Sequence, residues 1–80
     1  MEASGEIIRI EGIIRDVQAT PIAGVKVEAV GSGQESVTDG DGRYALSARS
    51  DDALVFTKNG YASQKIHIKG QDKVNVQMTK

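Results

Sequence analysis

This chain of 80 residues contains no cysteine and no tryptophan, and it has one proline, one histidine and three aromatic residues in all. The absence of cysteine excludes a disulfide framework and a zinc site built on thiolates. The lone histidine, His67, has no nucleophile and orienting group marked out by the sequence, so a catalytic triad is not indicated. The sequence therefore predicts that the chain is not an enzyme and has no catalytic residues, no metal site and no cofactor.

The chain also lacks a strong charge of one sign and a long apolar run. Ten basic residues face eleven acidic ones, for a net charge of −1, so nucleic acid is not an expected partner. No apolar run approaches the roughly 20 residues that cross a bilayer, and the polar start Met1–Gly5 does not resemble a signal peptide. Direct membrane insertion is not expected.

Apolar residues are present with a period of two, which predicts strands. In EIIRIEGIIRD the even-numbered Ile8, Ile10 and Ile14 form one apolar face, which we expect in the core. Gly12 has the same parity, and a glycine there suggests a bulky neighbour reaching across it, or a bulge. The same alternation in the later segments predicts that these residues also face inward: Val25, Val27, Ala29, Tyr44, Leu46, Leu54, Phe56, Ile66, Ile68, Val74, Val76 and Met78.

Seven such segments follow one another at short spacing, separated by Gly, Asp, Asn and Ser, and none shows helical periodicity. Seven short alternating strands on a chain of this size predict a two-sheet sandwich or a small barrel. Asn59-Gly60 predicts a two-residue hairpin turn in which both residues have positive φ. We expect a flexible N-terminus over residues 1–6 and a single domain over residues 7–80.

The stretch TDGDGRYAL (Thr38 to Leu46) allows two interpretations. A calcium loop of the EF-hand kind would place its oxygen ligands at Asp39, Asp41 and Arg43, and arginine cannot ligate a cation. A tight turn needs only aspartates that bond nearby N–H groups and glycines that adopt positive φ. We therefore expect a turn that leads into a strand.

The segments IEGIIRD, TPIAGVKVEAVGS, TDGDGRYAL, LVFTKNGYASQKIHI and VNVQM, taken in this order, cover the chain from about Ile8 onward. With them the chain resembles the carboxypeptidase regulatory-like domain, a transthyretin-like (prealbumin-like) family. The resemblance implies an all-β, seven-stranded Greek-key β-sandwich, which agrees with the strand count. Hydrolases of similar fold need several histidines and a C-terminal Tyr-Arg-Gly-Ser motif, whereas this chain ends Val-Gln-Met-Thr-Lys.

The resemblance also implies a role. Such domains accompany metallocarboxypeptidases, precede the plug of many outer-membrane TonB-dependent receptors, and recur in bacterial surface proteins. It implies a non-catalytic accessory domain (a spacer, stabilising or protein-interaction module) of a larger bacterial exported or cell-envelope protein. The implied location is extracytoplasmic: periplasm, outer membrane or cell surface.

The candidate partner is a neighbouring domain or protein of the parent assembly. Ile7 and Ile13 fall on the mixed face of the first strand, where one buried face does not explain them, so they are candidates for a contact surface.

The alternative function is a small carbohydrate-binding module. Tyr61 would supply its exposed ring, because sugar sites use flat aromatic platforms. Lys65, His67 and Lys69 share the outward parity and form either a basic stripe that steers an acidic partner or a sulfated sugar, or a solvated face.

Overall fold

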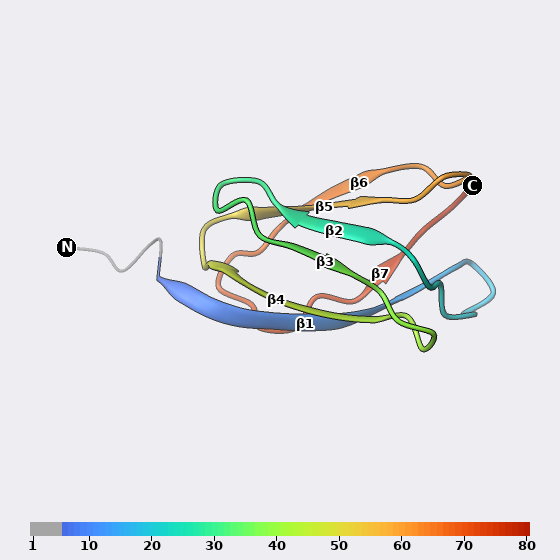
Figure 1. Cartoon of the computed structure of the whole chain (residues 1–80), viewed down its shortest axis with the longest axis horizontal. Helices are drawn as coiled ribbons and strands as arrows, with labels where there is room; N and C mark the ends of the chain where they lie inside the picture. The colour runs from blue at the N-terminus through green and yellow to red at the C-terminus, as the bar shows by residue number, and fades with distance from the viewer. Residues whose placement is uncertain (1–5) are drawn as a thin grey trace.

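The computed structural model describes residues 6–80, which form seven strands in two sheets packed face to face (Figure 1). The strands are β1 (Ile7–Arg15), β2 (Lys26–Ala29), β3 (Glu35–Val37), β4 (Arg43–Arg49), β5 (Ala53–Thr57), β6 (Gln64–His67) and β7 (Val76–Gln77). Every element in this part of the chain is a strand, and no helix of the length and apolarity needed to span a membrane occurs in it. The predicted all-β, seven-stranded sandwich is confirmed.

The two sheets have the strand orders β4-β1-β7 and β3-β2-β5-β6. All neighbouring strands are antiparallel except β1 and β7, which run parallel. The chain changes sheet between β1 and β2, between β3 and β4, between β4 and β5, and between β6 and β7. These crossings between two sheets are those of a Greek-key sandwich.

The core lies between the inner faces of the sheets, and the residues predicted to face inward lie there. Tyr44 and Phe56 meet edge to face with ring centroids 5.7 Å apart, an arrangement that aromatic pairs favour. Ile8 and Ile66 are partly buried and pack against the core. The other predicted core residues are buried: Ile10, Ile14, Val25, Val27, Ala29, Tyr44, Leu46, Leu54, Phe56, Ile68, Val74, Val76 and Met78.

The predicted two-residue hairpin at Asn59-Gly60 is wrong. Residues 58–63 separate β5 from β6, so the connection has six residues. The amide of Tyr61 donates to the carbonyl of Lys58 at 3.0 Å. Gly60 has φ of 89°, whereas Asn59 is not among the residues with positive φ. One positive φ at the third position is the pattern of a type II turn, which does not join two paired strands directly.

The C-terminal part of the chain is less regular than its alternation suggests. β7 has two residues, and before it Lys73 forms an isolated parallel bridge with Glu11 of β1. β6 ends at His67, and Lys69 lies beyond it with φ of 51°. Lys69 is therefore in a turn, and Lys65, His67 and Lys69 do not continue as one row along a strand.

Two buried polar side chains hold the connections. The hydroxyl of Thr38 accepts from the Val25 amide at 2.9 Å and donates to the Ile22 carbonyl at 2.7 Å. The carboxylate of Asp52 accepts from the amides of Gly31 (2.8 Å) and Ala53 (2.7 Å). It also accepts from the amide and the hydroxyl of Ser32, both at 3.0 Å. Asp52 thus ties the β2–β3 turn to the start of β5.

The expected flexible N-terminus, residues 1–6, falls largely on residues 1–5, which lie outside the described part of the chain. Glu6 is described, and its carbonyl accepts from the Ser50 amide at 2.8 Å. The pairing of β1 with β4 therefore extends one residue before β1, and the domain boundary at residue 7 stays a prediction.

Candidate interaction surface

The six residues predicted to form an interaction surface do not come together. Ile7 and Ile13 lie on β1 in the three-stranded sheet, while the other four belong to β6 and the loops around it in the four-stranded sheet. These four are Lys65 and His67 on β6, Tyr61 before it and Lys69 after it. The prediction thus describes two separate surfaces.

Ile7 and Ile13 share the outer face of β1 but do not form one apolar patch. They are six positions apart, roughly 20 Å along a strand, and Arg9 and Glu11 point outward in between. Ile7 is 60% exposed, whereas Ile13 is half-buried. A partner that contacts both would have to extend along most of β1.

Tyr61 does not present an open ring. Its side chain is half-buried and packs against the core. The ammonium of Lys80 lies 5.6 Å from the ring centroid, a distance at which a cation is attracted to the ring face. One face of the ring is thus occupied by this chain itself.

The outer face of the three-stranded sheet carries all four arginines of the chain. In β1 and β4 the even-numbered residues face the core, and the odd-numbered ones face outward. The register places Arg9 opposite Ser47, Arg43 opposite Ile13 and Arg49 opposite Ile7. We call the four residues Arg9, Arg15, Arg43 and Arg49 the arginine face. The alternation in both segments carried this signal, but the pairing of β1 with β4 was needed to see it.

None of these arginines is in an ion pair within residues 6–80. The pair found there, Lys26 with Glu35 at 3.3 Å, lies on the four-stranded sheet. Glu11 is the one carboxylate among the outward residues of β1 and β4. Its backbone forms an isolated parallel β-bridge with that of Lys73, and the two side chains are not in an ion pair. The arginine face therefore carries more positive than negative charge, with Glu11 lying within it and the Asp39 carboxylate close enough to Arg43 to interact with it electrostatically.

Tyr44 crosses β1 at Gly12, as the glycine in the sequence suggested. Its hydroxyl donates to the Val74 carbonyl at 2.6 Å, on the far side of β1. A Cβ atom on Gly12 would lie 1.9 Å from that carbonyl oxygen and 3.0 Å from the Tyr44 ring. Burial raises the pKa of Tyr44, so its hydroxyl stays protonated and remains a donor.

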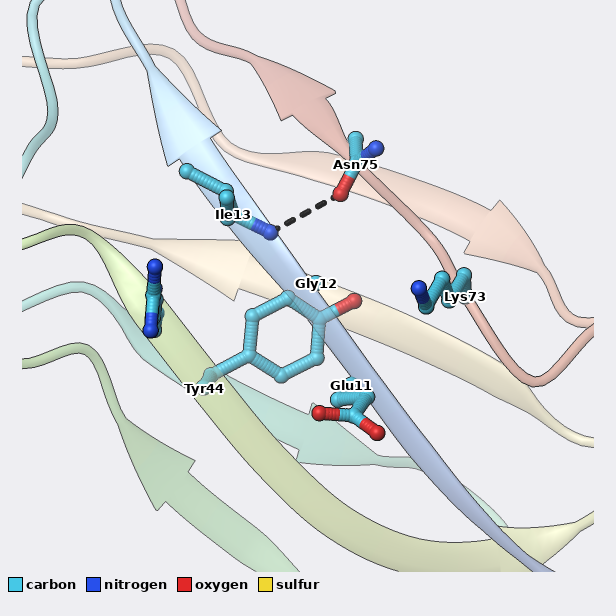
Figure 2. Close-up of a pocket in the computed structure, with 7 residues that line it drawn as sticks. Glu11, Gly12, Ile13, Tyr44, Lys73 and Asn75 are labelled. Carbon is cyan, nitrogen blue, oxygen red and sulfur yellow. Dashed lines mark hydrogen bonds between the residues drawn. The ribbon is translucent and has the colours of Figure 1, made fainter.

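The Asn75 side chain replaces one backbone hydrogen bond that is missing between β1 and the last segment of the chain. In the parallel register of β1 with the last segment, the Ile13 amide would donate to the Val74 carbonyl, which the Tyr44 hydroxyl takes instead. The Ile13 amide donates to the side-chain oxygen of Asn75 at 3.0 Å (Figure 2). The ladder bonds on either side, from Glu11 to Asp72 and from Met78 to Arg15, are kept at 3.1 and 2.8 Å.

A hollow of about 290 Å³ opens at this interruption (Figure 2). Gly12 and Tyr44 line it together with the outward residues of three neighbouring segments. Those outward residues are Glu11, Ile13, Arg43, Lys73 and Asn75. The hollow thus has two cations, one carboxylate and one amide at its rim.

The Asp39–Gly42 stretch is the expected turn. One carboxylate oxygen of Asp39 accepts from the amides of Asp41 (2.9 Å) and Arg43 (3.0 Å), and Gly42 has φ of 75°. The amides of Arg43 and Asp41 hold the pKa of Asp39 below its usual value. Within residues 6–80 no three His, Cys, Asp or Glu side chains are grouped as a metal site would require.

The chain is similar to known proteins over most of its length. It is 31% identical over 71 residues to the TonB-dependent receptor SusC of Bacteroides thetaiotaomicron. The match covers 89% of this chain and 7% of that receptor. The fold is similar to a chain in the crystal structure of a type II cohesin–X–dockerin complex from Acetivibrio cellulolyticus, with a TM-score of 0.65 and 21% identity. That match covers 88% of this chain and 56% of the other.

A family model also matches the chain over most of its length. The family model of the CarboxypepD_reg-like domain matches residues 10–80, which include every strand from the middle of β1 to β7. This protein belongs to the CarboxypepD_reg-like domain family.

Proposed function

We propose that the chain is a non-catalytic accessory module of a larger bacterial exported or cell-envelope protein, where it acts as a spacer, a stabilising domain or an interaction domain. The observation that carries this proposal is the unequal coverage of the match to SusC. Similarity extends over nearly all of this chain but over a small fraction of a TonB-dependent receptor. A sequence of this kind therefore occurs as one domain within a far longer polypeptide.

The location that fits this role is extracytoplasmic, in the periplasm, the outer membrane or at the cell surface. An antibody raised against residues 6–80 would test both location and context on fractionated cells of the source organism. We expect a band much larger than 8.5 kDa in the envelope fraction. A free polypeptide of about the size of this chain in the cytoplasmic fraction would overturn the proposal.

The contact to a neighbouring domain is proposed to run along the outer face of β1, through Ile7 and Ile13. Exchanging both for threonine should leave the domain folded, because Ile7 is 60% exposed and neither side chain is in the buried core. Thermal unfolding checks the fold, and limited proteolysis of the parent protein measures whether the domain detaches. An unfolded double variant would show that these residues are core.

A carbohydrate-binding function is the second candidate. It depends on Tyr61, whose ring is half-buried and has Lys80 over one face. Titration of the labelled domain with a panel of oligosaccharides, followed by NMR, tests it. Localised shifts around Tyr61 would favour it, and their absence would remove it.

A further inference from the structure

We propose that the arginine face binds a carboxylate-rich strand or loop of another protein domain. This inference rests on the proposed accessory function and names the chemistry of the partner. It starts from the placement of the chain's basic residues. All four arginines are on the outer face of β1 and β4, whereas Lys26 and Lys65 are on the strands of the other sheet and Lys73 lines the hollow at the border of the arginine face.

The arginines stand in diagonal pairs of like charge. Arg9 is opposite Ser47, two residues from Arg49, and Arg43 is opposite Ile13, two residues from Arg15. Diagonal neighbours across an antiparallel pair are about 7–8 Å apart, within reach of long side chains. Like charges at this distance repel weakly in water, and Glu11 on the same face offsets part of that repulsion. A partner that carries carboxylates would turn the repulsion into attraction.

The interrupted ladder adds a place where a carboxylate fits. The hollow at Gly12 is lined by Arg43, Lys73 and Asn75. The Asn75 side-chain oxygen is occupied by the Ile13 amide, and its nitrogen points away from Ile13 (Figure 2). An incoming carboxylate would meet the two cations, Arg43 and Lys73, there. Glu11, at the same rim, would favour a group that reaches the Arg43 and Asn75 side of the hollow.

A protein partner fits this surface better than a membrane does. Arginine binds planar carboxylates through two parallel hydrogen bonds, whereas attraction to an anionic lipid surface needs only charge and is served equally by lysine. Apolar Ile7, Ile13 and Ala45 lie among the arginines on the same face. A mixture of arginine and apolar side chains is typical of protein interfaces.

The test uses the 80-residue chain, which contains its own core, and a defined probe. The probe is a short peptide of alternating Glu and Val with blocked ends, and the control peptide has Gln in place of Glu. Binding is followed by shifts of backbone amides in NMR spectra. The variant R9Q/R43Q removes two charges from the arginine face, and K26Q/K65Q removes two from the outer face of the other sheet.

With the Glu/Val peptide, we expect shifts on β1, β4 and Asn75 in the wild-type chain and none comparable with Gln/Val. Binding should weaken about tenfold in R9Q/R43Q and change less than about twofold in K26Q/K65Q. It should also weaken as salt rises from about 50 to about 200 mM. Equal binding of both peptides, or shifts confined to β5 and β6, would overturn the proposal.

Two further measurements distinguish a protein partner from a membrane surface and from a purely stabilising role of the arginines. Sedimentation with vesicles of anionic and of neutral lipid tests the membrane: binding to anionic vesicles without binding to the peptide would overturn the protein partner in favour of a membrane surface. A lower Tm of R9Q/R43Q than of wild type would show that the arginines stabilise the domain, contrary to the repulsion argued above.

Failure of this inference differs from failure of the proposed function. If the antibody finds the chain within a large envelope protein and the peptide does not bind, the accessory role stands and the partner chemistry is wrong. If the chain is found as a free cytoplasmic polypeptide and the peptide binds, the surface stands and the accessory role fails.

Discussion

The two sheets of the sandwich differ in how regularly their strands are paired. In the four-stranded sheet, β2 pairs with β3 and β5, and β5 pairs with β6, all antiparallel over three or four residues each. In the three-stranded sheet, β1 pairs with β4 over seven residues but with β7 over two, and the parallel ladder is broken where Tyr44 crosses Gly12. In the three-stranded sheet, hydrogen bonds of the Tyr44 and Asn75 side chains therefore add to the backbone hydrogen bonds between β1 and the last segment.

The outer faces of the two sheets also differ in how their charged side chains are arranged. The four-stranded sheet sets Lys26 against Glu35 in an ion pair and mixes both signs along β2. The three-stranded sheet collects the arginines without such a pair among the described residues. The sheet with the broken ladder is thus also the one whose outer face carries more positive than negative side chains.

The largest effect should come from Gly12→Ala, which attacks the irregular sheet directly. The new Cβ would lie 1.9 Å from the Val74 carbonyl oxygen, which the Tyr44 hydroxyl holds. We expect a loss of about 3 kcal/mol in the free energy of unfolding, measured in urea. Gly40→Ala, in open space without positive φ, should change little. Similar values for both variants would show that β1 and β7 separate easily.

Asp52→Ala should be the corresponding break at the four-stranded sheet. It removes the acceptor of three backbone amides and one hydroxyl. Leaving these donors without a partner should cost about 2–3 kcal/mol, part of it recovered through water. Asp51→Ala, at the exposed neighbouring position, is the matched control. A loss no larger than that of the control would show that the β2–β3 turn does not depend on Asp52.

The same carboxylate should make stability sensitive to acid. Burial alone would raise the pKa of Asp52, but the amides of Gly31 and Ala53 and the Ser32 side chain outweigh it and hold the pKa below its usual value. The unfolded chain therefore binds the proton more tightly, so this stabilisation is present above about pH 4 and is lost as pH falls below it. Urea unfolding of Asp52→Asn at several pH values should show a smaller loss in acid than wild type. An unchanged acid slope would assign the effect to other carboxylates such as Asp39.

A smaller and more specific effect is expected from coupling between Tyr44 and Asn75. Asn75→Ala removes the acceptor of the Ile13 amide and should cost about 1 kcal/mol. In the Tyr44→Phe background the Val74 carbonyl is free to accept from Ile13, so the same change should cost less. A double-mutant cycle measures this as non-additivity. Strict additivity would mean that the Val74 carbonyl does not turn back into the ladder.

The smallest expected effect lies outside both sheets and raises stability. Ala19 has φ of 66° in the loop after β1, a conformation that costs an alanine more than a glycine. Ala19→Gly should therefore raise the free energy of unfolding by about 0.5–1 kcal/mol. Ala62→Gly, at an exposed position without positive φ, should lower it slightly. Destabilisation by Ala19→Gly would show that the loop does not strain the chain.

Much of the fold could be predicted from local pattern. The period of two identified the buried face of each strand, from Ile10 to Met78, because successive side chains of a strand point to opposite faces. The Asp39–Gly42 turn followed from its side-chain chemistry, since a carboxylate two and four residues from amides satisfies them within the loop. The glycine at position 12 correctly indicated a bulky neighbour, although the sequence did not say which.

The errors arose where local chemistry competes with tertiary packing. Asn59-Gly60 has the composition of a tight hairpin, yet β5 and β6 are joined by six residues, and Tyr61 packs against the core within that connection. Lys69 continues the alternation of β6 in the sequence but lies in a turn. In both cases residues beyond the local pattern decide where pairing ends.

Local pattern was enough to predict that this chain forms strands, which side of most strands faces the core, and which family the chain resembles. The position of β1 between β4 and β7 is visible in the folded structure alone. That placement gathers the four arginines on one face and brings Gly12, Tyr44 and Asn75 together. The physical reason is that alternation assigns a residue to a side of its own strand, whereas the neighbours of that strand are chosen by packing between segments distant in the chain.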